Sequence, residues 1–142
     1  MNFIISYIIC LVSFIVLDGL WISSNFNYYM TLLRKIQKEP FVLKIPAAVI
    51  AYVCLAIALY LYFKFLIYEI QTQKNYDMHL IAIFYGCLFG IAIYGTYSFT
   101  CCTYYKNYSY YDGFKDTVWG MILLSIIGIL FTHIFIHMNM KK

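Results

Sequence analysis

Four long stretches that carry almost no charge constrain this chain more than any other feature. They run from about Phe3 to Ser23, broken only by Asp18, and over 45–63, 80–105 and 117–140. A helix needs about 20 mostly apolar residues to cross a bilayer, because each residue adds only about 1.5 Å of rise. Only 11% of the residues are charged, whereas soluble domains usually carry about 25%. The sequence therefore predicts an integral membrane protein.

The expected fold is all-α, an antiparallel bundle of four transmembrane helices. We expect the whole chain, 1–142, to form this single domain, with helices at about 3–23, 45–68, 78–102 and 114–138. Helices are favoured because backbone groups in lipid must find hydrogen-bond partners within the protein, and the alternating strands of a membrane barrel are not visible. Pro46 suits the first turn of the second helix, where a missing N–H costs nothing.

The charge pattern indicates the partners and the orientation of the chain. The lipid bilayer is the expected partner, and a net charge of +4 is too small and dispersed to indicate nucleic acid. Six basic residues lie in the loops 25–44 and 106–115, against four on the other side. Cytoplasmic loops are enriched in Lys and Arg, so we expect these loops in the cytoplasm of a multi-pass protein. The membrane is a cell membrane or, for a viral chain, a host or viral membrane.

Asp18 is the residue that most strongly indicates a function. A carboxylate within a spanning helix costs about 2.5–3.5 kcal/mol on insertion scales, and such residues are functional candidates by default. Trp21 follows on the same helical face, and the same Asp-x-x-Trp pattern recurs at Asp116 and Trp119. Both patterns adjoin loops on one side of the membrane, so we expect the two pairs at similar depth in one leaflet.

Tyrosines from the other two helices fall in the same leaflet. We therefore predict a polar and aromatic layer that binds or transports a small molecule, an ion or a lipid headgroup. Its candidate ligand-binding residues are Asp18, Trp21, Tyr52, Tyr94, Tyr97, Asp116 and Trp119. No catalytic residue and no particular cofactor is indicated, because the familiar nucleophile, phosphate-loop and paired-carboxylate patterns are missing from the sequence.

Other interpretations of the same residues stay open. Tryptophan and tyrosine commonly form a belt at the membrane interface, and Asp116 at a helix start meets a favourable dipole. That dipole argument reverses for Asp18, which lies near the end of its helix. The alternatives to a binding protein are a structural or assembly protein of a cellular or viral membrane, and a membrane enzyme that uses Asp18 as acid or base.

Several motifs together resemble a known family. They are Leu17-Asp18-Gly19-Leu20-Trp21, Tyr28-Tyr29, Pro46, Tyr52, Gly86, Gly90, the run from Tyr94 to Thr100, and the run from Asp116 to Gly120. In this order they resemble an uncharacterised family of small, mostly bacterial membrane proteins catalogued as domain of unknown function 2177. The resemblance implies four helices and no known substrate. The family usually has Tyr-Asp-x-Thr-Asn at the end of helix three, where this chain has Ser98 and Cys101 in place of the Asp and the Asn.

Two further patterns yield weaker predictions. Gly86 and Gly90 form a small-residue stripe that lets helices approach closely, with the partner helix either in the same chain or in a second copy of a homo-oligomer. His133 and His137 lie one turn apart, and His79 falls on the same side of the membrane. These histidines are weak candidates for a metal site, and we predict no bound metal, because such spacing on one helix is a poor motif.

Overall fold

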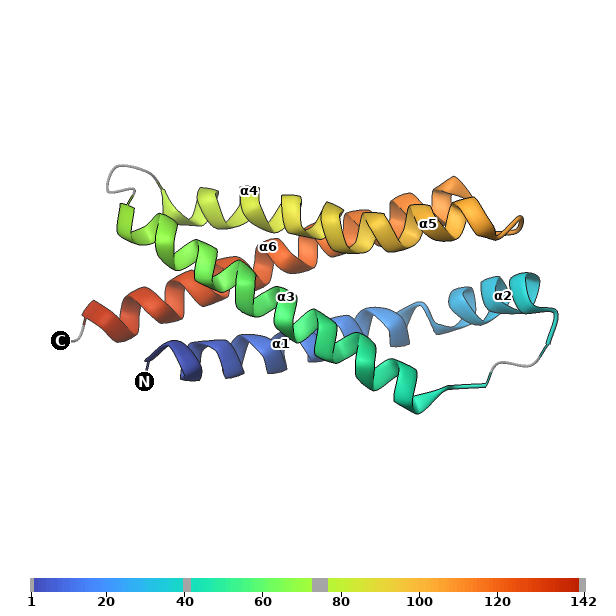
Figure 1. Ribbon diagram of the computed structural model, residues 1–142, viewed down its shortest axis with the longest axis horizontal. Helices are drawn as coiled ribbons and strands as arrows, with labels where there is room; N and C mark the ends of the chain where they lie inside the picture. Colours follow the sequence, from blue (N-terminus) through green and yellow to red (C-terminus); the bar gives the residue numbers. More distant parts are fainter. Residues whose placement is uncertain (1, 40–41, 73–76, 141–142) are drawn as a thin grey trace.

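The fold is a bundle of long helices, shown in the computed structural model of Figure 1, which describes residues 2–39, 42–72 and 77–140. The elements are α1 (Asn2–Ser24), α2 (Phe26–Gln37), α3 (Ile45–Thr72), α4 (Met78–Gly90), the π-helical segment η1 (Ile91–Gly95), α5 (Thr96–Tyr104) and α6 (Tyr110–Met140). No strand occurs within the described ranges. The predicted all-α fold is therefore confirmed.

Four stretches are long and apolar enough to cross a membrane, as predicted. They are Phe3–Ser24, Ile45–Thr72, Met78–Tyr104 and Tyr110–Met138. The third of these joins α4, η1 and α5 into one span. Pro46 occupies the second position of α3, within the first turn as expected. Which side faces the cytoplasm stays a prediction.

The fourth span begins earlier than expected because a capping box starts it. The Ser109 backbone N–H donates to the Asp112 carboxylate over 2.8 Å, and the Asp112 N–H donates to the Ser109 hydroxyl over 3.3 Å. This reciprocal pairing satisfies two backbone N–H groups that the first turn of a helix leaves open. Helix α6 therefore begins at Tyr110 instead of near 114.

The loop after α1 contains a helix that we did not predict. Helix α2 is amphipathic, with Leu32 buried and Arg34 and Lys35 exposed. It ends at Gln37 and is capped by Lys38, whose φ of 58° is left-handed and whose N–H donates to the Arg34 carbonyl. In Figure 1, α2 extends the line of α1 beyond the first turns of α3. Because α2 is short and mixed in composition, its sequence could not be distinguished from that of the surrounding polar loop.

The glycine stripe packs against α6 of the same chain. A Cβ added to Gly86 would lie 2.6 Å from the Ser125 backbone, and one added to Gly90 would lie 2.5 Å from the Met121 backbone. Only glycine allows the two backbones to lie this close. Of the two partners left open for this stripe, the structure therefore shows the one in the same chain. A homo-oligomer stays a prediction.

The half of the bundle near the termini has a closely packed aromatic and aliphatic core. Phe63 of α3 stacks on Phe131 of α6 with ring centroids 4.2 Å apart, and the buried Tyr62 hydroxyl donates to the Ala82 carbonyl over 2.8 Å. Helix α3 runs obliquely across the bundle, so its first turns diverge from α5 while its last turns lie beside α4 (Figure 1). This divergence opens the bundle at the end where the candidate residues lie.

Candidate functional site

Asp18 accepts hydrogen bonds from three of the other elements of the bundle. Its side chain, on α1, is only 7% exposed. One carboxylate oxygen accepts from the Tyr94 hydroxyl of η1 and from Nε1 of Trp119 on α6, each over 3.2 Å. The other accepts from the Tyr52 hydroxyl of α3 over 3.4 Å. All three donors are neutral, and no lysine, arginine or histidine of the described ranges joins them.

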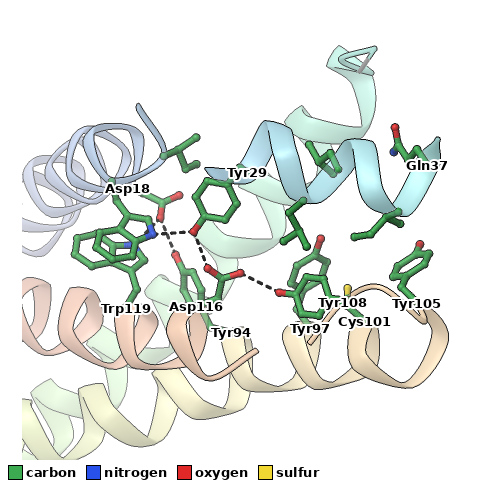
Figure 2. Close-up of a pocket in the computed structure, with 15 residues that line it drawn as sticks. Asp18, Tyr29, Gln37, Tyr94, Tyr97, Cys101, Tyr105, Tyr108, Asp116 and Trp119 are labelled. Atoms are coloured by element: carbon green, nitrogen blue, oxygen red, sulfur yellow. Dashed lines mark hydrogen bonds between the residues drawn. The ribbon is translucent and has the colours of Figure 1, made fainter. Parts of the chain in front are cut away.

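The two tryptophans of the chain stack directly on each other beside this carboxylate. The rings of Trp21 and Trp119 lie 4.4 Å apart at an interplanar angle of 4°. Nε1 of Trp21 donates to the Tyr29 hydroxyl over 2.9 Å, and that hydroxyl donates to Asp116 over 2.6 Å (Figure 2). The two Asp-x-x-Trp pairs therefore meet across α1 and α6, and α2 supplies the hydroxyl that links them.

Asp116 is a second carboxylate whose donors are neutral. Besides Tyr29 it accepts from the Tyr108 hydroxyl, over 3.0 Å. Burial raises the pKa of Tyr29, and its hydrogen bond to Asp116 raises it further. Burial and the negative charge of Asp116 likewise raise the pKa of Tyr108. Both phenols therefore stay protonated at cellular pH and act as donors.

The π-helical segment η1 and a glycine of α6 together place Tyr94. Single π-helical turns within α-helices occur frequently at functional sites, and η1 interrupts the third span at Ile91–Gly95. The Tyr94 ring lies against Gly120, where an added Cβ would be only 2.3 Å from ring carbons. Any side chain at Gly120 would push the Tyr94 ring away from Asp18.

A first cavity of about 470 Å³ lies between α2 on one side and α5 on the other. This volume falls in the usual range of small-molecule pockets, about 300–1,000 Å³. Figure 2 shows Tyr97, Tyr105 and Tyr108 facing α2 across the space. It is lined by Asp18, Trp21, Ile22, Tyr29, Leu32, Leu33, Ile36, Gln37, Tyr94, Tyr97, Cys101, Tyr105, Tyr108, Asp116 and Trp119. We call it the aromatic cavity.

A second cavity of about 540 Å³ lies where α3 diverges from the third span. It is lined by Asp18, Ala51, Tyr52, Cys54, Leu55, Ala58, Ile93, Tyr94 and Tyr97. We call it the lateral groove. Asp18, Tyr94 and Tyr97 belong to both linings, so a single carboxylate borders an aromatic space and an apolar one.

Sequence reasoning missed a neighbouring group of contacts. The Tyr28 hydroxyl donates to Asp112, and burial together with this hydrogen bond raises the pKa of Tyr28. Nζ of Lys115 lies 3.6 Å from the Tyr28 ring centroid and donates to Oδ1 of Asn25 over 2.8 Å. This lysine is therefore held by aromatic faces and an amide, which is a cation–π arrangement.

The histidines do not form a site within the described ranges. The rings of His133 and His137 stack 6.5 Å apart on an exposed face of α6, and His79 follows the N-cap of α4. Across the described ranges no group of three or more His, Cys, Asp or Glu side chains could hold a metal ion. The three histidines therefore do not come together around one metal position.

All seven predicted candidates line at least one of the two cavities. Tyr29 and Tyr108 were missed as donors to Asp116, although the first stands in a family-like Tyr-Tyr pair and the second in a loop rich in tyrosine. The two departures from the family pattern lie in this region too. Ser98 is fully buried, and Cys101 is a wall residue of the aromatic cavity.

The fold and the site define a polytopic membrane protein with a polar layer inside its helix bundle. The chain belongs to the family of predicted membrane proteins called domain of unknown function 2177, whose pattern matches residues 3–132. No curated protein and no solved structure matches the chain.

Proposed function

We propose that this protein binds a small cationic ligand, one that carries an ammonium group, in the layer around Asp18. The observation that carries the proposal is the surroundings of this carboxylate. Asp18 is 7% exposed, its three hydrogen-bond donors are neutral, and it borders the aromatic cavity. When ionised, a carboxylate within a spanning helix needs a counter-charge, and no basic side chain of the described ranges pairs with Asp18.

The aromatic walls favour the same class of ligand. Faces of Trp and Tyr attract ammonium groups, by about 2 kcal/mol or more when the site is shielded from water. The aromatic cavity is lined by two tryptophans, five tyrosines and two carboxylates. The ammonium group of Lys115, which lies over the ring of Tyr28, shows that aromatic faces at this end of the bundle accept a cation.

The test is binding of tetramethylammonium to the purified protein in a nonionic detergent. Both tryptophans lie beside Asp18, so their fluorescence reports directly on the layer. We expect saturable binding that weakens at least tenfold in Asp18→Asn, because that variant keeps the shape and loses the charge. Glu39→Gln removes an exposed charge outside both cavities and should bind normally. Equal binding by Asp18→Asn and the unaltered protein contradicts the proposal.

A structural role is the second candidate, and the hydrogen bonds of both carboxylates favour it. Asp18 and Asp116 together accept from five side chains of α2, α3, η1, α6 and the loop before α6. In that case the polar layer ties the helices together and holds no ligand. Asp18→Leu, which removes the acceptor, should then lower the thermal stability in detergent, and tetramethylammonium should bind neither this variant nor the unaltered protein.

A further inference from the structure

The lateral groove differs from the aromatic cavity in what surrounds it. Its α3 wall comes from Ala51, Tyr52, Cys54, Leu55 and Ala58, of which Ala51 and Cys54 are exposed. These residues lie within the span Ile45–Thr72. An exposed side chain in a spanning helix faces lipid, so the mouth of the groove opens to the hydrocarbon of the bilayer.

Apart from Asp18, the tyrosine hydroxyls and the Cys54 thiol, the groove offers a ligand no polar side chain. Leu55, Ile93 and the two alanines supply apolar walls, and Asp18 is its only ionisable carboxylate. An apolar wall that ends at one acidic group is complementary to a molecule with a hydrocarbon chain and a cationic end. A soluble cation without a hydrocarbon chain would leave the apolar part of this space unfilled.

The shared lining of the two cavities fixes how such a molecule would lie. Asp18, Tyr94 and Tyr97 border both spaces, so a cation beside Asp18 touches the aromatic cavity and the inner end of the groove together. The groove then leads outward between α3 and η1, away from the polar layer. A chain attached to that cation has an apolar path that reaches the lipid.

We infer that the occupant is an ammonium-bearing amphiphile, which enters from the bilayer with its hydrocarbon chain in the lateral groove and its headgroup at Asp18. This inference rests on the proposed function and adds the substrate class and the route of entry. The chain gains little free energy from the groove over lipid, since both are apolar. The groove therefore orients the molecule, and Asp18 with the aromatic faces supplies the selectivity.

The experiment uses a photoreactive amphiphile with a dodecyl chain, a diazirine on that chain and a trimethylammonium headgroup. The purified full chain in maltoside micelles is irradiated with it, and the adducts are located by mass spectrometry. We expect adducts on α3 between 51 and 58 and on Ile93, and at least a fivefold loss of labelling in Asp18→Asn. The same chain with a sulfate headgroup should label these positions at the background level.

A pair of double variants on neighbouring faces of α3 tests the groove itself. Ala51→Phe with Cys54→Phe narrows the groove, whereas Ile50→Phe with Val53→Phe places the same two rings at exposed positions outside its lining. The first pair should reduce labelling at least fivefold, and the second should leave it unchanged. Neither adds a tryptophan, so tetramethylammonium binding can be followed in both by the fluorescence of Trp21 and Trp119.

Two results overturn the inference in ways that can be told apart. If tetramethylammonium binds in an Asp18-dependent manner while the dodecyl probe labels α3 equally in both double variants, the lateral route is wrong and the proposed function stands. If neither labelling by the probe nor binding of tetramethylammonium depends on Asp18, both the lateral route and the proposed function are contradicted.

Discussion

The two halves of the bundle are held together by different means. Near the termini, glycines bring α4 and α6 into backbone contact, and buried rings such as Phe63 and Phe131 fill the remaining space. At the other end, hydrogen bonds from tyrosine and tryptophan to carboxylates connect the helices around two cavities. Close packing leaves no room for a ligand, whereas a hydrogen-bonded layer spans a space without filling it. The contrast indicates that one half is closely packed and that the other contains the two cavities.

Replacement of glycine by alanine at two positions is the strongest test of this difference in packing. We expect Gly90→Ala to lower the free energy of unfolding by about 1–3 kcal/mol, since overpacking against a backbone costs this much and the new Cβ would meet Met121 at 2.5 Å. Gly19→Ala has nothing within 4 Å of its Cβ and should leave stability unchanged or slightly raised. Thermal unfolding in detergent, followed by circular dichroism, measures both. Equal effects would mean that the two halves do not differ in packing.

Removal of the Asp18 carboxylate should cost somewhat less. Asp18→Leu leaves the donors of Tyr94 and Trp119 without their acceptor, at about 1–3 kcal/mol for an unsatisfied buried donor, and this loss is partly offset because a carboxylate is removed from a spanning helix. Asp18→Asn keeps an acceptor oxygen and should unfold within about 0.5 kcal/mol of the unaltered protein. A comparison of the two variants by the same thermal assay separates hydrogen bonding from charge. Similar losses in both would show that the charge itself stabilises the bundle.

The stacked tryptophans should contribute a smaller, measurable coupling. We expect a double-mutant cycle of Trp21→Leu and Trp119→Leu to give a coupling free energy of about 0.5–1.5 kcal/mol, typical of aromatic pairs. The rings lie 4.4 Å apart and nearly parallel, so each single variant removes the ring-on-ring stack. Additive losses in the cycle would show that the stack contributes nothing beyond the burial of each ring.

The smallest effect on stability is expected from removal of the hydrogen bond that attaches the end of α2 to the loop before α6. Nδ2 of Asn107 donates to the carbonyl of Lys35 over 2.7 Å, and both residues are exposed. Asn107→Ala should therefore change global stability by no more than about 0.5 kcal/mol, while amide hydrogen exchange in α2 becomes faster. Exchange in the middle of α6 serves as the internal control. Unchanged exchange in α2 would mean that this hydrogen bond does not stabilise the helix.

Much of the architecture could be predicted because lipid imposes a simple rule. Long uncharged stretches have to become helices, and the four spans were placed to within a few residues. The side on which Asp18 and Asp116 meet also followed, since alternating helices return to the same leaflet. Helix α2 could not be predicted in this way, because it is not a span and its pattern is short.

The candidate layer was predictable in its residue types and less so in its contacts. Asp18 and the tryptophans stood out because charge in a spanning helix is costly. Nothing in the spacing showed that Tyr29 would link Trp21 to Asp116, or that α3 would diverge to leave a groove. Such features depend on helix crossing angles, which side-chain packing decides and periodicity does not.

The π-helical turn of the third span sets the angular phase between its two halves. An α-helix turns by about 100° per residue, and η1 accommodates one residue more per turn than its neighbours do. Conversion of this turn to regular α-helix with all residues kept would rotate α5 by roughly that angle while the glycines keep α4 seated on α6. Tyr97 and Cys101 would then leave the cavity wall. Deletion of one residue within η1 would remove the wide turn and the extra residue together, so α5 would keep its phase. The wide turn is therefore what directs Tyr97 and Cys101 toward the cavity without disturbing the packed half.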